Sequence, residues 1–462
     1  MLPLESLKQS VWCPALVLCA ALWAFIPMSA SGELEEAESI RALPNPLGLT
    51  AAKRIAVRDN PGLLAVARRI DAAVAAVDLA RTAYYPTARL NSGVSRTENL
   101  ATGGSGVGGT APFETYEIGA TASWLLFDGA GRRFRLLGAQ VGVDIEERGH
   151  EDAQRLLLQG VATAYYGALL AQEGSRIARQ DADFNSKLSE ETQKRFAAGA
   201  AAKSEVLNFR IRTKQAESDY VRAEYSYRSA RTILAAFLGV NEAALPVDFA
   251  LEAVDPGALP ADPPELASEL SYALSHRPDL LVLQGRLRRL AAELKAIRSE
   301  YFPQLSFSAG TGLSRVDSPQ FNWDEDLTVG IGVNATWDVF TGGSTRHKSR
   351  VLKAQIAEVS DAIGQRTIEV ASELRQQLDA VGVAKAQVDL LGAIFDMSSE
   401  VRDLVRSEYL AGRTSLTRLN EAQTDLVRAS GGLATARIRL FLASEDLGAA
   451  SGRILGSVPS EQ

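Results

Sequence analysis

The stretch from Leu327 to Arg346 decides the fold, and it reads LTVGIGVNATWDVFTGGSTR. From Leu327 to Val339, apolar residues alternate with small or polar ones. This period of two predicts a β-strand with one apolar and one polar face, long enough to cross a bilayer at a tilt. The turn residues Phe340 to Gly343 follow, and a long helical pattern then begins.

The same pattern occurs once earlier in the chain, from Tyr116 to Gly129. Trp124 and Trp337 lie 213 positions apart, and Gly129 lies the same distance before Gly342. A repeat of this length changes the expected fold. We therefore interpret the chain as a duplication of one unit made of strands and helices.

Each unit also predicts a first strand, which follows a proline. Tyr84-Tyr85-Pro86 and Tyr301-Phe302-Pro303 lie 217 positions apart, and each ends a helical pattern because proline cannot continue a helix. The offset then falls to 213, so the glycine-rich loop from Gly103 to Gly109 makes the first copy longer. The four predicted strands cover about residues 88–96, 116–127, 304–314 and 327–339.

Long helical patterns fill most of the remaining sequence. The pattern over residues 131–196 alone would be roughly 100 Å long as a helix. In the last helix, leucines repeat at every seventh position, which predicts a left-handed coiled coil; they are Leu419, Leu426, Leu433 and Leu440. Short reversals at Gly199 and Gly412 fold the long helices into two hairpins.

Residues 1–30 are predicted to be a signal peptide for export. Lys8 precedes an apolar run from Val11 to Pro27, and small residues follow the run. A membrane anchor is the alternative, although the run is short for a span. Both cysteines of the chain, Cys13 and Cys19, lie in this segment. An exported chain with lipid-compatible strands is typical of the outer membrane.

The duplication sets the predicted domain organisation. The first repeat covers residues 31–245, and the second covers 265–448. A proline-rich connector, residues 246–264, joins them, and residues 449–462 form a C-terminal tail. Four strands are too few to close a barrel with a lumen. Since open strand edges are not tolerated in lipid, the chain must associate with further copies.

The composition argues against several other functions. The chain has 462 residues and a formal charge of −7, and its charge pattern indicates no nucleic acid partner. Its three histidines are scattered without ligand spacing, so no metal site is expected. The glycines from Gly104 to Gly109 match the spacing of a dinucleotide-binding loop, but they lie between strands and open no helix. We therefore expect neither an enzyme nor a cofactor site.

The duplicated motifs give the chain a resemblance to a known family. They are Tyr84-Tyr85-Pro86, Tyr301-Phe302-Pro303, Phe340-Thr341-Gly342-Gly343, and the reversals Phe196-Ala197-Ala198-Gly199 and Tyr409-Leu410-Ala411-Gly412. Because these motifs occur in this order and are duplicated, the chain resembles the TolC family of outer membrane efflux proteins over nearly all of its mature length. The first copy departs from the pattern at Ala130, where a second glycine is usual. We expect this departure to loosen the strand exit.

The resemblance implies an α+β membrane protein that acts as a homotrimer. A twelve-stranded β-barrel would lie in the outer membrane lipid, continued by a long periplasmic α-helical coiled-coil tunnel. The trimer would dock a periplasmic adaptor and an inner membrane transporter, as the passive exit duct of an efflux pump or a type I secretion system. Two alternatives stay open: a non-channel coiled-coil surface protein, which needs no lipid-type strands, and a periplasmic adaptor, which lacks two copies of them.

The candidate site residues lie close to the two reversals. Glu205 lies six positions after Gly199, Arg418 lies six positions after Gly412, and Glu421 follows one turn later. The resemblance implies that the tunnel narrows here to a periplasmic constriction, and that Gly199 and Gly412 mark hairpin tips that contact the adaptor. Because their charges are opposite, we hypothesise that Glu205 and Arg418 pair across neighbouring hairpins. The candidate switches between helix and strand are Pro86, Pro303, Gly129 and Gly342.

Overall fold

The computed structural model describes residues 43–97, 112–246, 249–253 and 264–457. The chain up to Asn45 is a separate unit, so the description below concerns Pro46–Gln462. The predicted signal peptide and the glycine-rich loop lie outside the described residues. Within those residues, no helix combines the length and the apolar composition that crossing a membrane requires.

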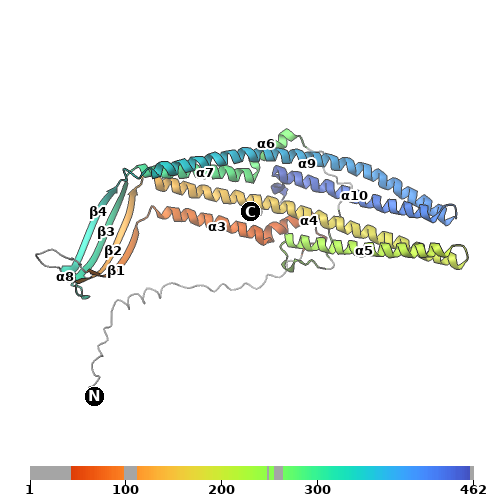
Figure 1. Ribbon diagram of the computed structural model, residues 1–462, viewed down its shortest axis with the longest axis horizontal. Coiled ribbons are helices and arrows are strands. Elements are labelled where there is room, and N and C mark those ends of the chain that lie inside the picture. Colours follow the sequence, from red (N-terminus) through yellow and green to blue (C-terminus); the bar gives the residue numbers. More distant parts are fainter. Residues whose placement is uncertain (1–42, 98–111, 247–248, 254–263, 458–462) are drawn as a thin grey trace, which may run out of the picture. The chain divides into compact units, whose positions relative to one another are not determined.

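The four strands form one antiparallel sheet in the order β1-β2-β3-β4 (Figure 1). Their bounds are Thr87–Thr97 for β1, Phe113–Phe127 for β2, Gln304–Val316 for β3 and Leu327–Thr336 for β4. Because β2 pairs with β3, the sheet joins strands from both copies of the repeat. The last strand ends three residues earlier than predicted, since a tight turn begins at Trp337, whose carbonyl accepts the amide of Val339.

The register of the sheet gives it two different faces. Side chains alternate between the faces along each strand, so residues opposite one another on neighbouring strands share a face. One apolar row consists of Ala88, Ala122, Ala309 and Ile331. The next row, on the other face, consists of Arg89, Thr121, Gly310 and Gly330. The predicted alternation of lipid-compatible and polar faces is therefore present across all four strands.

The helices repeat in the same order in the two copies. The first copy contains α2 Leu49–Asp59, α3 Pro61–Thr82, α4 Gly131–Ala197 and α5 Lys203–Phe237. The second contains α6 Leu266–His276, α7 Pro278–Arg298, α9 Ser344–Leu410 and α10 Leu416–Ser451. Four short helices were not predicted: η2 Asn241–Ala243, η3 Ser299–Tyr301, α8 Trp323–Asp326 and η4 Arg453–Ser457. The long helices α4 and α9 have 67 residues each, so the duplication extends to their length.

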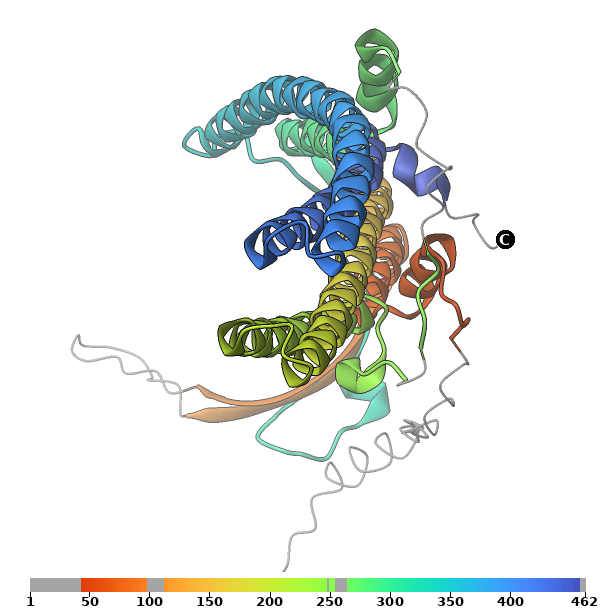
Figure 2. The same ribbon diagram turned by 90° about the vertical axis from the view of Figure 1, so that its right-hand side faces the viewer.

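The predicted leucine row of α10 forms the core between the helices. All four of its leucines are at most 9% exposed. Leu440 packs with the row of α9 that contains Leu374, Val381 and Val388, and Leu419 packs with Val405 and Tyr409 of the same helix. Burying each such side chain stabilises the packing by about 2 kcal/mol. Figure 2 shows the resulting hairpins, α4 with α5 and α9 with α10, from the side of their tips.

The predicted C-terminal tail is largely part of the fold. The helix α10 continues to Ser451, and η4 follows it. Ala449 and Ile454 are buried in one cluster with Leu158 of α4. Apolar side chains at these positions fix residues 449–457 against the first copy. The boundary at residue 448 stays a prediction.

Candidate functional site

The two hairpin tips share one backbone geometry. Gly199 and Gly412 adopt φ angles of 73° and 71°, which favour glycine because it has no Cβ. The amide of Gly199 bonds the carbonyl of Phe196, and the amide of Gly412 bonds the carbonyl of Tyr409, both at 2.9 Å. These bonds close the last turn of α4 and of α9. Both predicted tips are therefore tight, exposed reversals.

Behind the tips, Tyr409 joins the two hairpins. Its side chain is buried, and its ring lies 6.3 Å from that of Phe209 on α5, edge to face. The guanidinium of Arg195, on α4, lies 5.2 Å from the centre of the same ring. Cation–π contacts of this kind hold charged and aromatic groups together without a carboxylate.

A second aromatic ring repeats the arrangement on the same side of the hairpins. Phe184 of α4 lies under two guanidinium groups of α9, with Arg402 at 5.6 Å and Arg406 at 5.7 Å from the ring centre. Leu188 and Leu419 pack beside these rings in one apolar cluster. The two hairpins of one chain are therefore bonded to each other close to their tips.

The structure places Glu205 beside this aromatic contact. Glu205 is half-buried in the first turn of α5, where the positive end of the helix dipole favours a carboxylate. Burial raises the pKa of Tyr409, and the negative charge of Glu205 adds to this rise. Within one chain, the charge of Glu205 thus contributes to the raised pKa of Tyr409.

Arg418 and Glu421 lie exposed on the first turns of α10. The Oγ atom of Ser415 accepts the amide hydrogen of Arg418 at 3.4 Å, so the helix start is capped. Over the described part of one chain, no ion pair joins Glu205 to Arg418. Their pairing stays a prediction for hairpins of neighbouring chains.

Sequence reasoning missed a polar contact between the hairpins. The amide of Gln423 on α10 donates to the carboxylate of Asp181 on α4 at 2.6 Å. Burial raises the pKa of Asp181, and the hydrogen bonds from Gln423 and Asn185 oppose that rise. Tyr409 could have been found, because it belongs to a duplicated reversal motif. Asp181 and Gln423 lie 242 residues apart and follow no pattern that would have indicated them.

The junctions between helix and strand are built in parallel in the two copies. Trp124 donates its indole hydrogen to the carbonyl of Tyr84 at 2.9 Å, and Trp337 donates to Tyr301 at 3.1 Å. Each acceptor lies two residues before the proline that precedes the first strand, Pro86 or Pro303. One indole therefore bonds the entrance and the exit of each strand pair together.

The exit of β2 forms a tight turn although its second glycine is missing. Gly129 adopts a φ of 63°, and a Cβ there would lie 2.8 Å from the Cβ of Phe302, so only glycine fits. Ala130 follows in a left-handed conformation, with φ of 70°. The buried carboxylate of Asp128 accepts the amide hydrogen of Arg132 at 2.7 Å and fixes the turn. This bond fixes the turn around Ala130, and a looser exit than that of the second copy stays a prediction.

At the second exit, Gly342 and Gly343 have φ angles of 63° and 83°. A Cβ on Gly342 would meet nothing within 4 Å, so its backbone conformation alone calls for glycine. The four predicted switches thus lie where helix and strand meet.

Comparison with known proteins identifies the family. The model of the family described as "Outer membrane efflux protein" matches residues 54–240 and 270–453, which are the two copies of the repeat. The chain belongs to this family of outer membrane efflux proteins. The predicted outer membrane location and the role of an export channel follow from this membership.

Relatives extend the match over nearly the whole chain. Protein CyaE from Bordetella pertussis is 24% identical over 96% of this chain and 98% of its own length. Outer membrane protein TolC from Vibrio cholerae is 25% identical over 63% of this chain and 64% of its own length. The predicted TolC family is confirmed by these matches together with the family model.

Solved structures confirm the fold. The outer membrane channel CmeC from Campylobacter jejuni superposes with a TM-score of 0.76 at 18% identity, over 90% of this chain and 87% of its own. CusC superposes with a TM-score of 0.76 at 17% identity, over 87% of this chain and 91% of its own. Family and fold are those of transport channels rather than of enzymes, and they decide against a surface protein and an adaptor.

Proposed function

We propose that three copies of this chain form a channel-tunnel that serves as the passive exit duct of an export system. One observation carries the proposal: the four-stranded sheet has an apolar face, a polar face and two unpaired edges, β1 and β4. In lipid, unpaired backbone groups find no water, so a spanning sheet must close on itself. Three copies give a twelve-stranded barrel with its apolar face toward lipid and its polar face toward a lumen.

The lumen face supports passage of a large cargo. Glycine, serine and threonine dominate the strand positions on this face, and such side chains leave the interior wide. Arg89 and Glu117 are its charged residues within the described strands. The barrel therefore conducts, and any restriction lies in the helical part.

The partners are a periplasmic adaptor and an inner membrane transporter, which supplies the energy. The hairpin tips at Gly199 and Gly412 are the contact points for the adaptor. Their exposure and their matching backbone geometry support this assignment, because an adaptor would meet similar tips from both copies.

The names of the relatives indicate different cargoes. One is an alkaline protease secretion protein, one exports pyoverdine and one is a cobalt-zinc-cadmium resistance protein. Channels of one fold thus serve different cargo classes. The transporter, rather than this chain, selects what passes through the duct.

The periplasmic constriction is formed by Glu205, Arg418 and Glu421. All three lie in the first two turns of α5 or α10, directly after a hairpin tip, and Arg418 and Glu421 are exposed and free to face an opening. In the trimer, the pairing of Glu205 with Arg418 between neighbouring chains keeps the opening narrow. Exposed ion pairs contribute less than about 1 kcal/mol each, so binding of the adaptor can widen the opening.

The test is single-channel conductance of the purified protein in planar bilayers, with its mass measured in detergent. A trimer with small, discrete conductances is expected. Arg418→Glu breaks the proposed pairs and is expected to raise conductance at least twofold. The matched control is Arg428→Glu, an exposed charge further along α10, which is expected to leave it unchanged. A monomer without conductance would refute the duct, and an unchanged Arg418→Glu channel would refute the constriction.

A further inference from the structure

A hydrogen bond between Asp181 and Gln423 joins the two hairpins of one chain near their tips. The Nε2 atom of Gln423 on α10 donates to the Oδ1 atom of Asp181 on α4 at 2.6 Å. A second bond of the same kind, from Gln159 of α4 to Asp446 of α10 at 2.7 Å, lies farther along the helices from the tips. The contact of Asp181 with Gln423 is therefore the one that acts close to the helix reversals.

This contact leaves one polar atom without a partner. Gln423 is 8% exposed, and its Oε1 atom is buried without a hydrogen-bond partner among the described residues. Buried polar atoms without a partner cost free energy. An ionised carboxylate only accepts hydrogen bonds, so Asp181 cannot supply the missing donor while it is charged. The contact is therefore incomplete when Asp181 is ionised.

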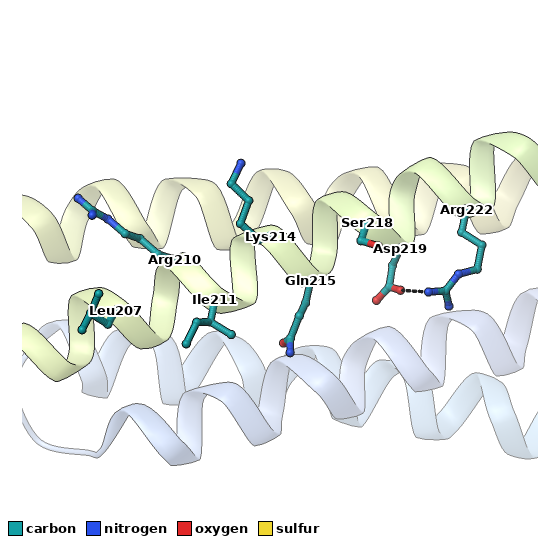
Figure 3. Close-up of a pocket in the computed structure, with 8 residues that line it drawn as sticks. All are labelled: Leu207, Arg210, Ile211, Lys214, Gln215, Ser218, Asp219 and Arg222. Carbon is teal, nitrogen blue, oxygen red and sulfur yellow. Dashed lines mark ion pairs between the residues drawn. The ribbon is translucent and has the colours of Figure 1, made fainter.

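The surroundings of Asp181 favour its neutral form. Burial has the largest effect and raises the pKa of Asp181, and the hydrogen bond from Gln423 opposes this rise. From α5, Asp219 raises the pKa further and Arg212 lowers it. Asp219 is itself paired with Arg222 at 3.4 Å, as Figure 3 shows. The net result is a raised pKa, so Asp181 binds a proton at a higher pH than an exposed aspartate does.

Two cations of α9 lie near this carboxyl group along the hairpins but belong to other contacts. Arg402 and Arg406 lie over the ring of Phe184, about one helical turn further along α4. Arg402 also lies 2.9 Å from the carboxylate of Asp403, and Arg406 lies 3.9 Å from that of Glu191. Over the part of the chain that the structure describes, no ion pair includes the carboxylate that Gln423 binds. Its protonation therefore breaks no salt bridge.

We propose that Asp181 and Gln423 form a pH-sensitive contact between the hairpins, in which protonation of Asp181 adds a second hydrogen bond. One proton from solvent binds to the Oδ2 atom of Asp181. The new hydroxyl group donates to the Oε1 atom of Gln423, while Nε2 still donates to Oδ1. Both groups are planar and already share one bond, so the second bond requires only rotation about side-chain torsions. Protonation thus removes a buried charge and satisfies the buried oxygen in one step.

The contact acts on the periplasmic constriction, so its effect on the duct rests on the function proposed above. Glu205 belongs to the first hairpin, whereas Arg418 and Glu421 belong to the second. Two hydrogen bonds hold the hairpins together more firmly than one. The opening between these residues is therefore expected to be narrower in acid than at neutral pH.

The duplication shows that the repeated helices do not themselves require this pair. At the offset of 213 positions, the equivalents of Asp181 and Gln423 are Ile394 on α9 and Arg210 on α5. Neither side chain exchanges a proton between pH 5 and pH 8. The carboxyl and amide groups are therefore a property of the contact between α4 and α10, and each chain has one such contact.

Thermal unfolding of the full chain in detergent tests the contact without reference to the duct. Asp181→Asn provides both hydrogen bonds without a charge at any pH. It is expected to unfold roughly 2 °C or more above the wild type at pH 7.5. The difference should shrink at pH 5, because a carboxyl group with a raised pKa stabilises the fold as the pH falls through that pKa. The matched control is Asp183→Asn, an exposed neighbour on α4, which is expected to follow the wild type.

Single-channel conductance tests the effect on the constriction at the same two pH values. Carboxylates with ordinary pKa values stay ionised at pH 5. The wild type and Asp183→Asn are expected to lose at least half of their conductance between pH 7.5 and pH 5. Asp181→Asn is expected to have the low conductance at both. Gln423→Leu removes the amide and is expected to have the high conductance at both.

The two readouts separate the possible failures. Equal pH responses of Asp181→Asn and the wild type in thermal unfolding would overturn the contact, whatever the duct does. The expected unfolding result with a conductance that does not depend on Asp181 would overturn its action on the constriction. A monomer without conductance would overturn the duct, while the unfolding comparison would still decide whether Asp181 and Gln423 respond to pH.

Discussion

The molecule builds the same helix junction twice, around Asn60 in the first copy and around Arg277 in the second. In the first, the Oδ1 atom of Asn60 accepts the amide hydrogens of Gly62 at 2.9 Å and of Leu63 at 3.2 Å. Its Nδ2 atom donates to the carbonyl of Phe237 at 3.0 Å. One short neutral side chain thus caps α3 and bonds the end of α5.

In the second copy, Arg277 makes the corresponding bond with a charge. It is 0% exposed, and it donates to the carbonyl of Ala450 at 2.8 Å. It also pairs with Asp279 at 2.8 Å and with Glu373 at 2.6 Å. Arg366 binds the same two carboxylates. A network of four charged side chains in the second copy thus takes the place of the single amide of Asn60 in the first.

The two junctions show what this part of the fold requires. Phe237 and Ala450 are equivalent residues at the end of the return helix, and Gly239 and Gly452 follow them in left-handed conformations. A donor to that carbonyl is common to both junctions, but its chemistry differs. In the first copy, Gly62 and Gly160 stand where the second has Asp279 and Glu373, so these positions offer no carboxylate to a cation.

The largest effect is expected when the charged junction around Arg277 is broken. Arg277→Ala removes a fully buried cation from the partly exposed carboxylates of Asp279 and Glu373, which keep Arg366 as a partner. The expected cost is therefore at the lower end of that for breaking a buried pair, about 3 kcal/mol. We expect this loss in the free energy of unfolding, measured in urea by the circular dichroism of the helices. Arg375→Ala, an exposed change on α9, is the control. A loss for Arg277→Ala no greater than that of the control would show that the network contributes nothing.

The glycines that follow the two return helices, Gly239 and Gly452, provide a second test of the difference between the junctions. A Cβ on Gly239 would lie 2.6 Å from the carbonyl oxygen of Asp59, whereas one on Gly452 would lie 3.6 Å or more from its neighbours. Gly239→Ala therefore adds a steric clash to the left-handed strain and is expected to cost about 3 kcal/mol. Gly452→Ala carries only the strain, about 1–2 kcal/mol. Equal losses in the same urea assay would contradict the difference in space.

Acid should weaken only the second junction. Burial alone would raise the pKa of Asp279, but hydrogen bonds and attraction from Arg277 and Arg366 outweigh it and lower the pKa to about 2. A lowered carboxyl pKa stabilises the fold above the unfolded value, near 3.9, and this stability is lost as the pH falls through about 2. We expect a loss of about 2 kcal/mol over this window.

The measurement compares urea unfolding at pH 5 and pH 2.5 for the wild type and for Asp279→Asn. The variant is expected to be less stable at pH 5 and to lose less than the wild type on acidification. If both proteins lost equal stability between the two pH values, the acid sensitivity would have to come from other carboxylates. Asn60 carries no charge, so the first junction contributes nothing to this change.

Glycine and proline at the ends of helices explain why the helices and strands could be predicted well from the sequence. The long helical pattern predicted after Gly343 and before the reversal at Gly412 matches α9, because both glycines adopt left-handed conformations at its two ends. Alternation identified all four strands, since one face of the sheet must be apolar. The duplication then gave independent support, because each pattern had to occur twice.

Contacts between distant residues explain what could not be predicted. Arg277 and Glu373 lie 96 positions apart, and no local pattern marks an arginine that is to be buried. The contact of Phe184 with Arg402 likewise joins the two copies. Trp337 continued the strand alternation, yet a local turn removed it from β4. Such contacts and strand ends depend on residues that become neighbours only when the chain folds.

The smallest expected effect separates the two tasks of Asn60. Asn60→Ala removes the cap and the donor, and loss of a cap costs about 1 kcal/mol. Asn60→Asp keeps an oxygen for the amides of Gly62 and Leu63 but places a second acceptor against the carbonyl of Phe237. If the bond to the return helix is what both junctions share, Asn60→Asp should be no more stable than Asn60→Ala in urea, although aspartate caps a helix well. Recovery of wild-type stability by Asn60→Asp would show instead that the cap alone matters in the first copy, and that the likeness to Arg277 lies in position only.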